Sequence, residues 1–202
     1  MRKPLVFLLS VLLVLSATGT TLGELIGHWK FDEGAGAVAN DSSGKNHHGT
    51  ILGTPDWTTG PGGEGSALAF MPNTCTGVDC GVFDPTNGKG KFSLALWAFW
   101  DGTGTFQHFF TKSTTYGATT MMLQVELWGA HTNAVYTDRV GVSYQAAGSV
   151  PFFLMPKNEW VHIAFVFDGT DLRAYQNGLD EMGPQPFSIG ADLTSACLIG
   201  VY

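Results

Sequence analysis

The amino-acid sequence predicts an all-β protein built as a two-sheet antiparallel sandwich. Short apolar runs alternate along the chain with clusters of Gly, Asn, Asp and Pro, a pattern typical of strands joined by tight turns. The chain contains 27 glycines and 12% aromatic residues, and no convincing helix follows its first 23 residues. About ten or more short strands of this kind favour a sandwich, with a closed barrel as the alternative.

The clearest predicted element is a hairpin over residues 160–178. Residues 161–167 are apolar except for His162, so this strand is predicted to be buried on both faces. Asp168-Gly169 marks a turn, residues 172–176 form the return strand, and Asn177-Gly178 is typical of a type I′ turn.

Other apolar runs predict further strands. The run at 92–100 is apolar on both faces, as expected inside a sandwich. The remaining predicted strands cover residues 25–32, 66–70, 106–112, 120–128 and 139–144. We find no internal repeat or linker, and therefore expect one domain over residues 24–202.

Residues 1–23 have the pattern of a secretory signal peptide. Arg2 and Lys3 precede an apolar run at 5–15 that only Ser10 interrupts, and small residues follow it. A membrane anchor is the alternative, but the run is about half the length of a span. No second apolar run of this kind appears, so we expect a secreted or cell-surface protein with no membrane span after cleavage.

The net charge bears on the class of partner, and the cysteines bear on disulfide formation. The net charge is −7 without a basic patch, which disfavours nucleic acid. Cys75 and Cys80 flank four residues, and in an oxidising compartment we expect them to form a small disulfide. Two free thiols are the alternative, while a zinc site lacks suitably spaced partners. Cys197 is expected to be a buried apolar residue.

The ordered segments resemble the laminin-G-like jelly roll of the concanavalin A-like lectin/glucanase superfamily. Over nearly all of the mature chain, the resemblance implies a jelly-roll sandwich. The segments that carry it are GHWKFDEGAG at 27–36, NDSSGKNHHGTI at 40–51, GSALAF at 65–70, FSLALWAFW at 92–100 and NEWVHIAFVFDGTDLRAYQNG at 158–178.

The sequence departs from this family pattern at two places. FMPN at 70–73 replaces the usual Phe-Asp-Gly, and the sequence stops at CLIGVY, 197–202, before the family's Ile-Asp-Glu-like strand. In the family the final strand returns beside the first, here residues 25–32. The resemblance therefore implies a jelly roll that lacks its final strand and is incomplete at its C-terminal end. The alternative is that residues 196–202 take over the closing position.

We expect no catalytic activity. Retaining glycosidases of the superfamily carry Glu-x-Asp-x-x-Glu on one strand, whereas Glu126 has no carboxylate two residues away. Asp180 and Glu181 are adjacent, so in an extended chain they point to opposite faces. His28 and His162 lie in predicted strands and are expected to play packing and hydrogen-bonding roles.

Calcium is the metal that the sequence favours, because Asp32, Asp41 and Asn46 lie in Gly-rich loops and supply hard oxygen atoms. The alternative is ordinary turn chemistry, in which Asp and Asn side chains cap their own turns. Relatives with a calcium ion near the chain ends often use a C-terminal Asp, which is absent here.

A secreted, non-catalytic recognition module for carbohydrate is the function we expect, with a protein-binding adhesion or scaffold module as the alternative. Its partner would be a glycan or an extracellular protein. Aromatic side chains at strand ends or in loops are candidates for stacking on a sugar ring. These are Trp57, Trp100, Trp128, Tyr116 and Tyr136. The alternative is that their rings fill the core, which is the role expected of Trp97 and Trp160.

Overall fold

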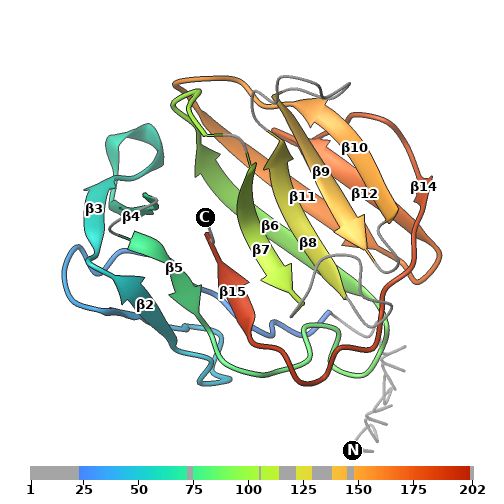
Figure 1. The fold of residues 1–202 in the computed structure, drawn as a ribbon, viewed down its shortest axis with the longest axis horizontal. Helices are drawn as coiled ribbons and strands as arrows, with labels where there is room; N and C mark the ends of the chain where they lie inside the picture. Colours follow the sequence, from blue (N-terminus) through green and yellow to red (C-terminus); the bar gives the residue numbers. More distant parts are fainter. Residues whose placement is uncertain are drawn as a thin grey trace, which may run out of the picture.

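The computed structural model describes residues 23–71, 75–104, 106–113, 122–128, 138–144 and 148–200. It is an all-β structure whose two main sheets pack face to face, which confirms the predicted jelly-roll sandwich (Figure 1). In these ranges the helical content is a single 3-10 turn, η1 (Pro61–Gly63). The predicted signal peptide lies outside the described residues, except for Gly23.

The larger sheet is antiparallel throughout and has eight strands. In spatial order they are β1 (Val38–Ala39), β2 (Gly49–Gly53), β5 (Cys75–Asp79), β15 (Cys197–Ile199), β7 (Phe106–Lys112), β8 (Leu123–Trp128), β9 (Arg139–Tyr144) and β10 (Gly148–Leu154). The late strand β15 pairs with β5 on one side and β7 on the other, joining early and middle parts of the chain.

The smaller sheet has the order β13 (Leu179–Asp180), β12 (Asp171–Gln176), β11 (Trp160–Phe167) and β6 (Phe92–Phe99). A short strand, β14 (Gln185–Pro186), also pairs with β12. β3 (Asp56–Thr59) and β4 (Ser66–Ala69) form a separate two-stranded ribbon.

The predicted hairpin is confirmed as β11 and β12. Asp168 Oδ1 accepts hydrogen bonds from the backbone N–H groups of Thr170 and Asp171, at 2.8 and 2.9 Å, and so fixes the first turn. Asn177 and Gly178 have φ values of 50° and 85°, the left-handed conformation that a type I′ turn requires.

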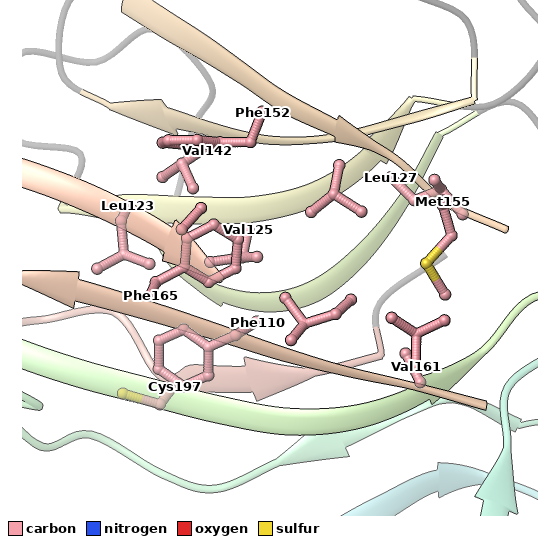
Figure 2. Close-up of a cluster of buried hydrophobic side chains, with 14 of the residues drawn as sticks. Phe110, Leu123, Val125, Leu127, Val142, Phe152, Met155, Val161, Phe165 and Cys197 are labelled. Atoms are coloured by element: carbon pink, nitrogen blue, oxygen red, sulfur yellow. The ribbon is translucent and has the colours of Figure 1, made fainter. Parts of the chain in front are cut away.

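The core lies between the two sheets (Figure 2). Val125 and Val142 of the larger sheet face Phe165 of the smaller sheet, and all three are fully buried. The Phe152 ring meets the Phe165 ring edge to face, with centroids 5.7 Å apart. Alternate residues of each strand supply this core, as expected of a sandwich.

The prediction of a strand over residues 25–32 is wrong. This segment forms only an isolated bridge between Trp29 and Asp41. Phe31 has a φ of 58°, which an extended strand does not allow. Side chains hold the segment instead: the Asp41 carboxylate accepts the His28 N–H at 2.8 Å.

The prediction that β6 and β11 are buried on both faces is also wrong. Their inner faces meet the core, but on the outer face Trp97 is 53% and Phe99 48% exposed. Trp160 and His162 lie opposite them across the strand pair and are half-buried. Trp97 and Trp160 are therefore not core residues, because in a two-layer fold each sheet has only one covered face.

The predicted Cys75–Cys80 disulfide is wrong, and all three cysteines are free. Cys75 begins β5, and the strand extends as far as Asp79. Five residues of extended chain span about 16 Å, whereas the two Cα atoms of a disulfide lie within about 7 Å. Cys197 is fully buried, as predicted.

Candidate ligand-binding site

Strand β8 is buried on both of its faces, which is unusual for a strand in a two-layer sandwich. Val125 and its apolar neighbours point into the core, whereas Gln124, Glu126 and Trp128 point to the opposite side of the larger sheet. These three are 9%, 4% and 9% exposed. Buried polar side chains outside the core are a candidate ligand site, because they are costly to bury without partners.

A bulge in β7 adds two more polar side chains to this side of the sheet. His108 pairs with Glu126 and Thr111 pairs with Gln124, so Phe109 is an extra residue between them. The extra residue brings His108 and Thr111 onto one face although they are three positions apart.

The same row of residues continues into the next two strands. Gln124 pairs with Ser143 of β9, and Ser143 pairs with Ser149 of β10. The two serine hydroxyl oxygens are 3.0 Å apart and hydrogen-bonded. We call this surface the polar face: His108, Thr111, Gln124, Glu126, Trp128, Ser143 and Ser149.

Four buried side-chain atoms of the polar face have no hydrogen-bond partner. They are His108 Nδ1, Thr111 Oγ1, Gln124 Oε1 and Glu126 Oε1. A buried polar atom left without a partner costs about 1–3 kcal/mol, so native proteins keep few of them. Four of them lie on two neighbouring strands, so these strands hold a concentration of polar atoms that could accept or donate further hydrogen bonds.

Glu126 contacts two other side chains of the polar face. Its Oε2 accepts a hydrogen bond from the Trp128 indole N–H at 3.1 Å and lies 4.0 Å from His108 Nε2. Gly141 lies opposite Glu126, and a Cβ there would come within 2.7 Å of the Trp128 ring. Glycine at position 141 therefore lets the indole lie against β9.

The nearest acid that the register places in the row of Thr111 and Gln124 is Asp79 on β5. Strands β5 and β8 are three spacings apart, about 14 Å. A retaining glycosidase needs its two carboxyl groups about 5–5.5 Å apart, and an inverting one about 6.5–9.5 Å. Asp79 and Glu126 are too far apart for either arrangement.

The predicted stacking residues do not come together. Trp128 lies on the polar face. Trp100 is only 2% exposed and donates its indole N–H to the Thr103 carbonyl at 2.6 Å. The Lys157 ammonium lies over the Trp100 ring. The structure does not support Trp100 as a stacking residue. Trp57 is half-buried on β3 and packs against the core. Tyr116 and Tyr136 lie outside the described residues.

The predicted calcium ligands are also separate. Asp41 is 7% exposed, and its carboxylate accepts hydrogen bonds from His28 N, Ser43 N, Ser43 Oγ and His47 N. Asp32 is exposed and faces the Ser66 N–H at 3.4 Å, whereas Asn46 adopts a left-handed turn conformation. Within the described ranges, no three His, Cys, Asp or Glu residues are placed to hold a metal ion. Turn chemistry accounts for Asp41.

Burial tends to raise the pKa of Asp41. The hydrogen bonds from Ser43, His28 and His47 outweigh burial and lower this pKa to about 2. The ionised carboxylate therefore ties the loop at 41–47 to the segment that contains His28.

Sequence reasoning missed an exposed aromatic surface on the smaller sheet. Trp97 meets His162 edge to face, with ring centroids 5.3 Å apart, and Phe99 lies 5.7 Å from Trp160. We call these four residues the aromatic face. The sequence feature that could have revealed this surface is the apolar outer face of β6. That face predicts burial when a second covering layer is assumed.

Residues 76–199 match the family model Laminin_G_3, described as the concanavalin A-like lectin/glucanases superfamily. The match covers more than half of the chain. The chain belongs to this superfamily. The comparison with curated proteins found no match for this chain.

Among solved structures, this chain is similar to domain 4 of AbnA, a GH43 extracellular arabinanase from Geobacillus stearothermophilus, solved in complex with arabinotriose. The TM-score is 0.62 at 18% identity, over 88% of this chain and 84% of that one. At this identity the likeness shows the fold alone. Across the described ranges, no helix has the length and apolar character needed to cross a bilayer.

Proposed function

We propose that the protein is a non-catalytic carbohydrate-binding module and that its ligand lies on the polar face. The four unpartnered atoms on β7 and β8 carry the proposal. A carboxylate and an amide oxygen accept hydrogen bonds, while a threonine hydroxyl both donates and accepts. Sugar hydroxyl groups match this mixture, because each of them also donates and accepts.

The comparison supports a sugar in particular. The similar domain of the arabinanase was solved with arabinotriose, and it has the same fold. Small-ligand sites typically combine aromatic side chains with a few convergent polar groups. Trp128 would supply the aromatic side chain beside Glu126, through its position against β9.

The wide separation of Asp79 and Glu126 supports a binding role without hydrolysis. The leader-like N-terminal pattern supports secretion, where extracellular glycans are available. The glycan proposal does not require the calcium ion predicted at Asp32, Asp41 and Asn46, since hydrogen bonds within its own loop and to His28 account for Asp41.

The test is isothermal titration with arabino-oligosaccharides, preceded by a glycan array to choose the ligand. Gln124→Leu keeps the approximate shape of the side chain and removes its acceptor. We expect at least tenfold weaker binding, which corresponds to about 1.4 kcal/mol. Glu126→Gln should weaken binding in the same direction, because it replaces a charged acceptor.

Trp97→Ala is the matched control, since Trp97 lies on the other sheet. It should bind the glycan as the unmodified protein does. If no glycan binds the folded protein, or if Trp97→Ala loses binding while Gln124→Leu keeps it, the polar face is not the site.

The aromatic face favours a second candidate, binding to an extracellular protein. Exposed Trp97 and Phe99 form an apolar patch of the kind found at interaction sites. Trp97→Ala would then abolish capture of the partner and leave glycan binding intact.

A further inference from the structure

One exposed aromatic side chain borders the polar face on β7. Phe106 is the first residue of this strand and is 45% exposed. It pairs with Trp128 of β8, and two positions further along the strands His108 pairs with Glu126. Because alternate residues of a strand share a face, Phe106 and His108 point to the same side of the larger sheet. Phe106 therefore lies at one end of the polar face.

Phe106 and Trp128 expose their rings to different extents. Residues directly opposite each other in an antiparallel pair have their Cβ atoms about 4.5–5.5 Å apart, so the two side chains are neighbours. Trp128 is only 9% exposed, because its ring lies against Gly141 and its indole N–H donates to Glu126. Phe106 therefore offers more accessible ring surface than Trp128 at this end of the sheet.

The position of Phe106 matches the two kinds of surface on a sugar ring. The C–H groups on the faces of the ring pack on an aromatic side chain, whereas the hydroxyl groups around its rim need hydrogen-bonding partners. His108 and Glu126, each with one unpartnered buried atom, form the row next to Phe106. Thr111 and Gln124, again with one such atom each, form a row beyond the bulge. Aromatic surface and hydrogen-bonding atoms thus follow one another along two strands.

The length of this surface indicates the size of the ligand. Trp128 and Gln124 are four positions apart on β8, which corresponds to about 13 Å of extended strand. A single sugar ring is shorter than this distance, so one ring cannot contact both Phe106 and the row of Gln124. A chain of several linked sugar units can contact both.

We propose that Phe106 stacks on one unit of an oligosaccharide whose neighbouring units are hydrogen-bonded by the polar face. Phe106 thereby makes the site select longer oligosaccharides over short ones. This inference rests on the proposed function, because it assigns a further contact to the same site. A single exposed aromatic ring is common on protein surfaces. The assignment depends instead on the register, which places Phe106 beside the rows that hold the four unpartnered atoms.

Isothermal titration with arabinobiose and arabinopentaose tests the stacking contact. If the glycan array selects another series, its two-unit and five-unit members replace them. Phe106→Ala should weaken binding of arabinopentaose about fivefold, the loss expected for one aromatic contact. Binding of arabinobiose should change less, because a disaccharide can remain on the polar face. Phe106→Tyr keeps the ring and should retain binding, whereas Phe106→Leu keeps apolar bulk without a flat ring and should behave like Phe106→Ala.

Phe99→Ala is the matched control, because Phe99 is also about half exposed but lies on the outer face of the smaller sheet. It should bind both oligosaccharides as the unmodified protein does. The inference is overturned if Phe106→Ala binds arabinopentaose as tightly as the unmodified protein, or if Phe99→Ala loses as much affinity. Equal affinity of the unmodified protein for arabinobiose and arabinopentaose would also overturn it.

The variants separate this inference from the proposed function. If Gln124→Leu weakens binding and Phe106→Ala does not, the polar face remains the site and only the role of Phe106 is wrong. If both variants weaken binding of arabinopentaose, both assignments are supported. If the folded, unmodified protein binds no glycan of the array, both are overturned.

Discussion

Replacing Asp41 by Asn should destabilise the protein by about 2–3 kcal/mol at pH 7. The carboxylate accepts four hydrogen bonds from His28, Ser43 and His47, and they lower its pKa from the ordinary 3.8 to about 2. That difference corresponds to roughly 2.4 kcal/mol between the folded and unfolded states. Asparagine keeps one acceptor but turns a donor toward N–H groups that need acceptors.

The sign of the pH dependence follows from the lowered pKa. Above the unfolded pKa the ionised carboxylate contributes its full stabilisation. As pH falls through about 2, the folded state also takes up the proton and the contribution is lost. The difference in unfolding free energy between the unmodified protein and Asp41→Asn should therefore shrink between about pH 4 and pH 2.

Urea denaturation followed by tryptophan fluorescence at several pH values measures this difference. Asp168→Asn is the matched control, because Asp168 also accepts two backbone N–H bonds but is exposed, and its effect should be smaller. A difference under about 0.5 kcal/mol at pH 7, or one that stays constant down to pH 2, would refute the assigned role of Asp41.

Three further predictions concern the buried cysteines, the buried Lys112 and the predicted calcium ligands. Alkylation in denaturant without reductant should add three alkyl groups by intact mass, and two or fewer would indicate a disulfide. Native alkylation should be slow, because burial raises the pKa of the Cys80 thiol and raises that of Cys197 to about 12. Lys112 is fully buried and donates a hydrogen bond to the Ser195 carbonyl. Lys112→Ala should therefore lower the free energy of unfolding, measured by urea denaturation, by about 3–5 kcal/mol, and Lys112→Met should lower it less. Equal losses for the two variants would contradict this role of Lys112. Titration of the EDTA-treated protein should show no saturable calcium binding, and saturable binding lost in Asp41→Asn would restore the calcium hypothesis.

The parts of the fold that could be predicted from sequence are those fixed by local chemistry. Asn177-Gly178 predicts its turn because few residues adopt left-handed backbone conformations. The position of β11 as a strand follows from its apolar run, but that run does not tell which face is buried, since both faces are apolar except at His162. The strand expected over residues 25–32 failed because long-range hydrogen bonds to Asp41 replaced strand pairing there.

The polar face could not be predicted, because it depends on the register of the consecutive strands β7 to β10 and on a bulge in β7, neither of which the sequence pattern specifies. In a regular strand His108 and Thr111, three positions apart, would point to opposite faces, and the bulge at Phe109 brings them onto one face. The sequence also gave no sign that Gln124 and Glu126 would both be buried, since polar residues alternating with apolar ones normally face solvent.

The outer face of β6 shows that an apolar strand pattern can mark either a buried face or an exposed apolar face. A strand that is apolar on both faces needs two contacting surfaces, and inside a multilayer fold both are supplied by the same chain. In this sandwich the inner row of β6 packs toward the core, while Trp97 and Phe99 remain about half exposed and one backbone edge stays open in the described structure. Exposed apolar area of this kind costs solubility unless another surface covers it. The apolar pattern of β6 therefore reflects the core on its inner row and an exposed aromatic surface on its outer row.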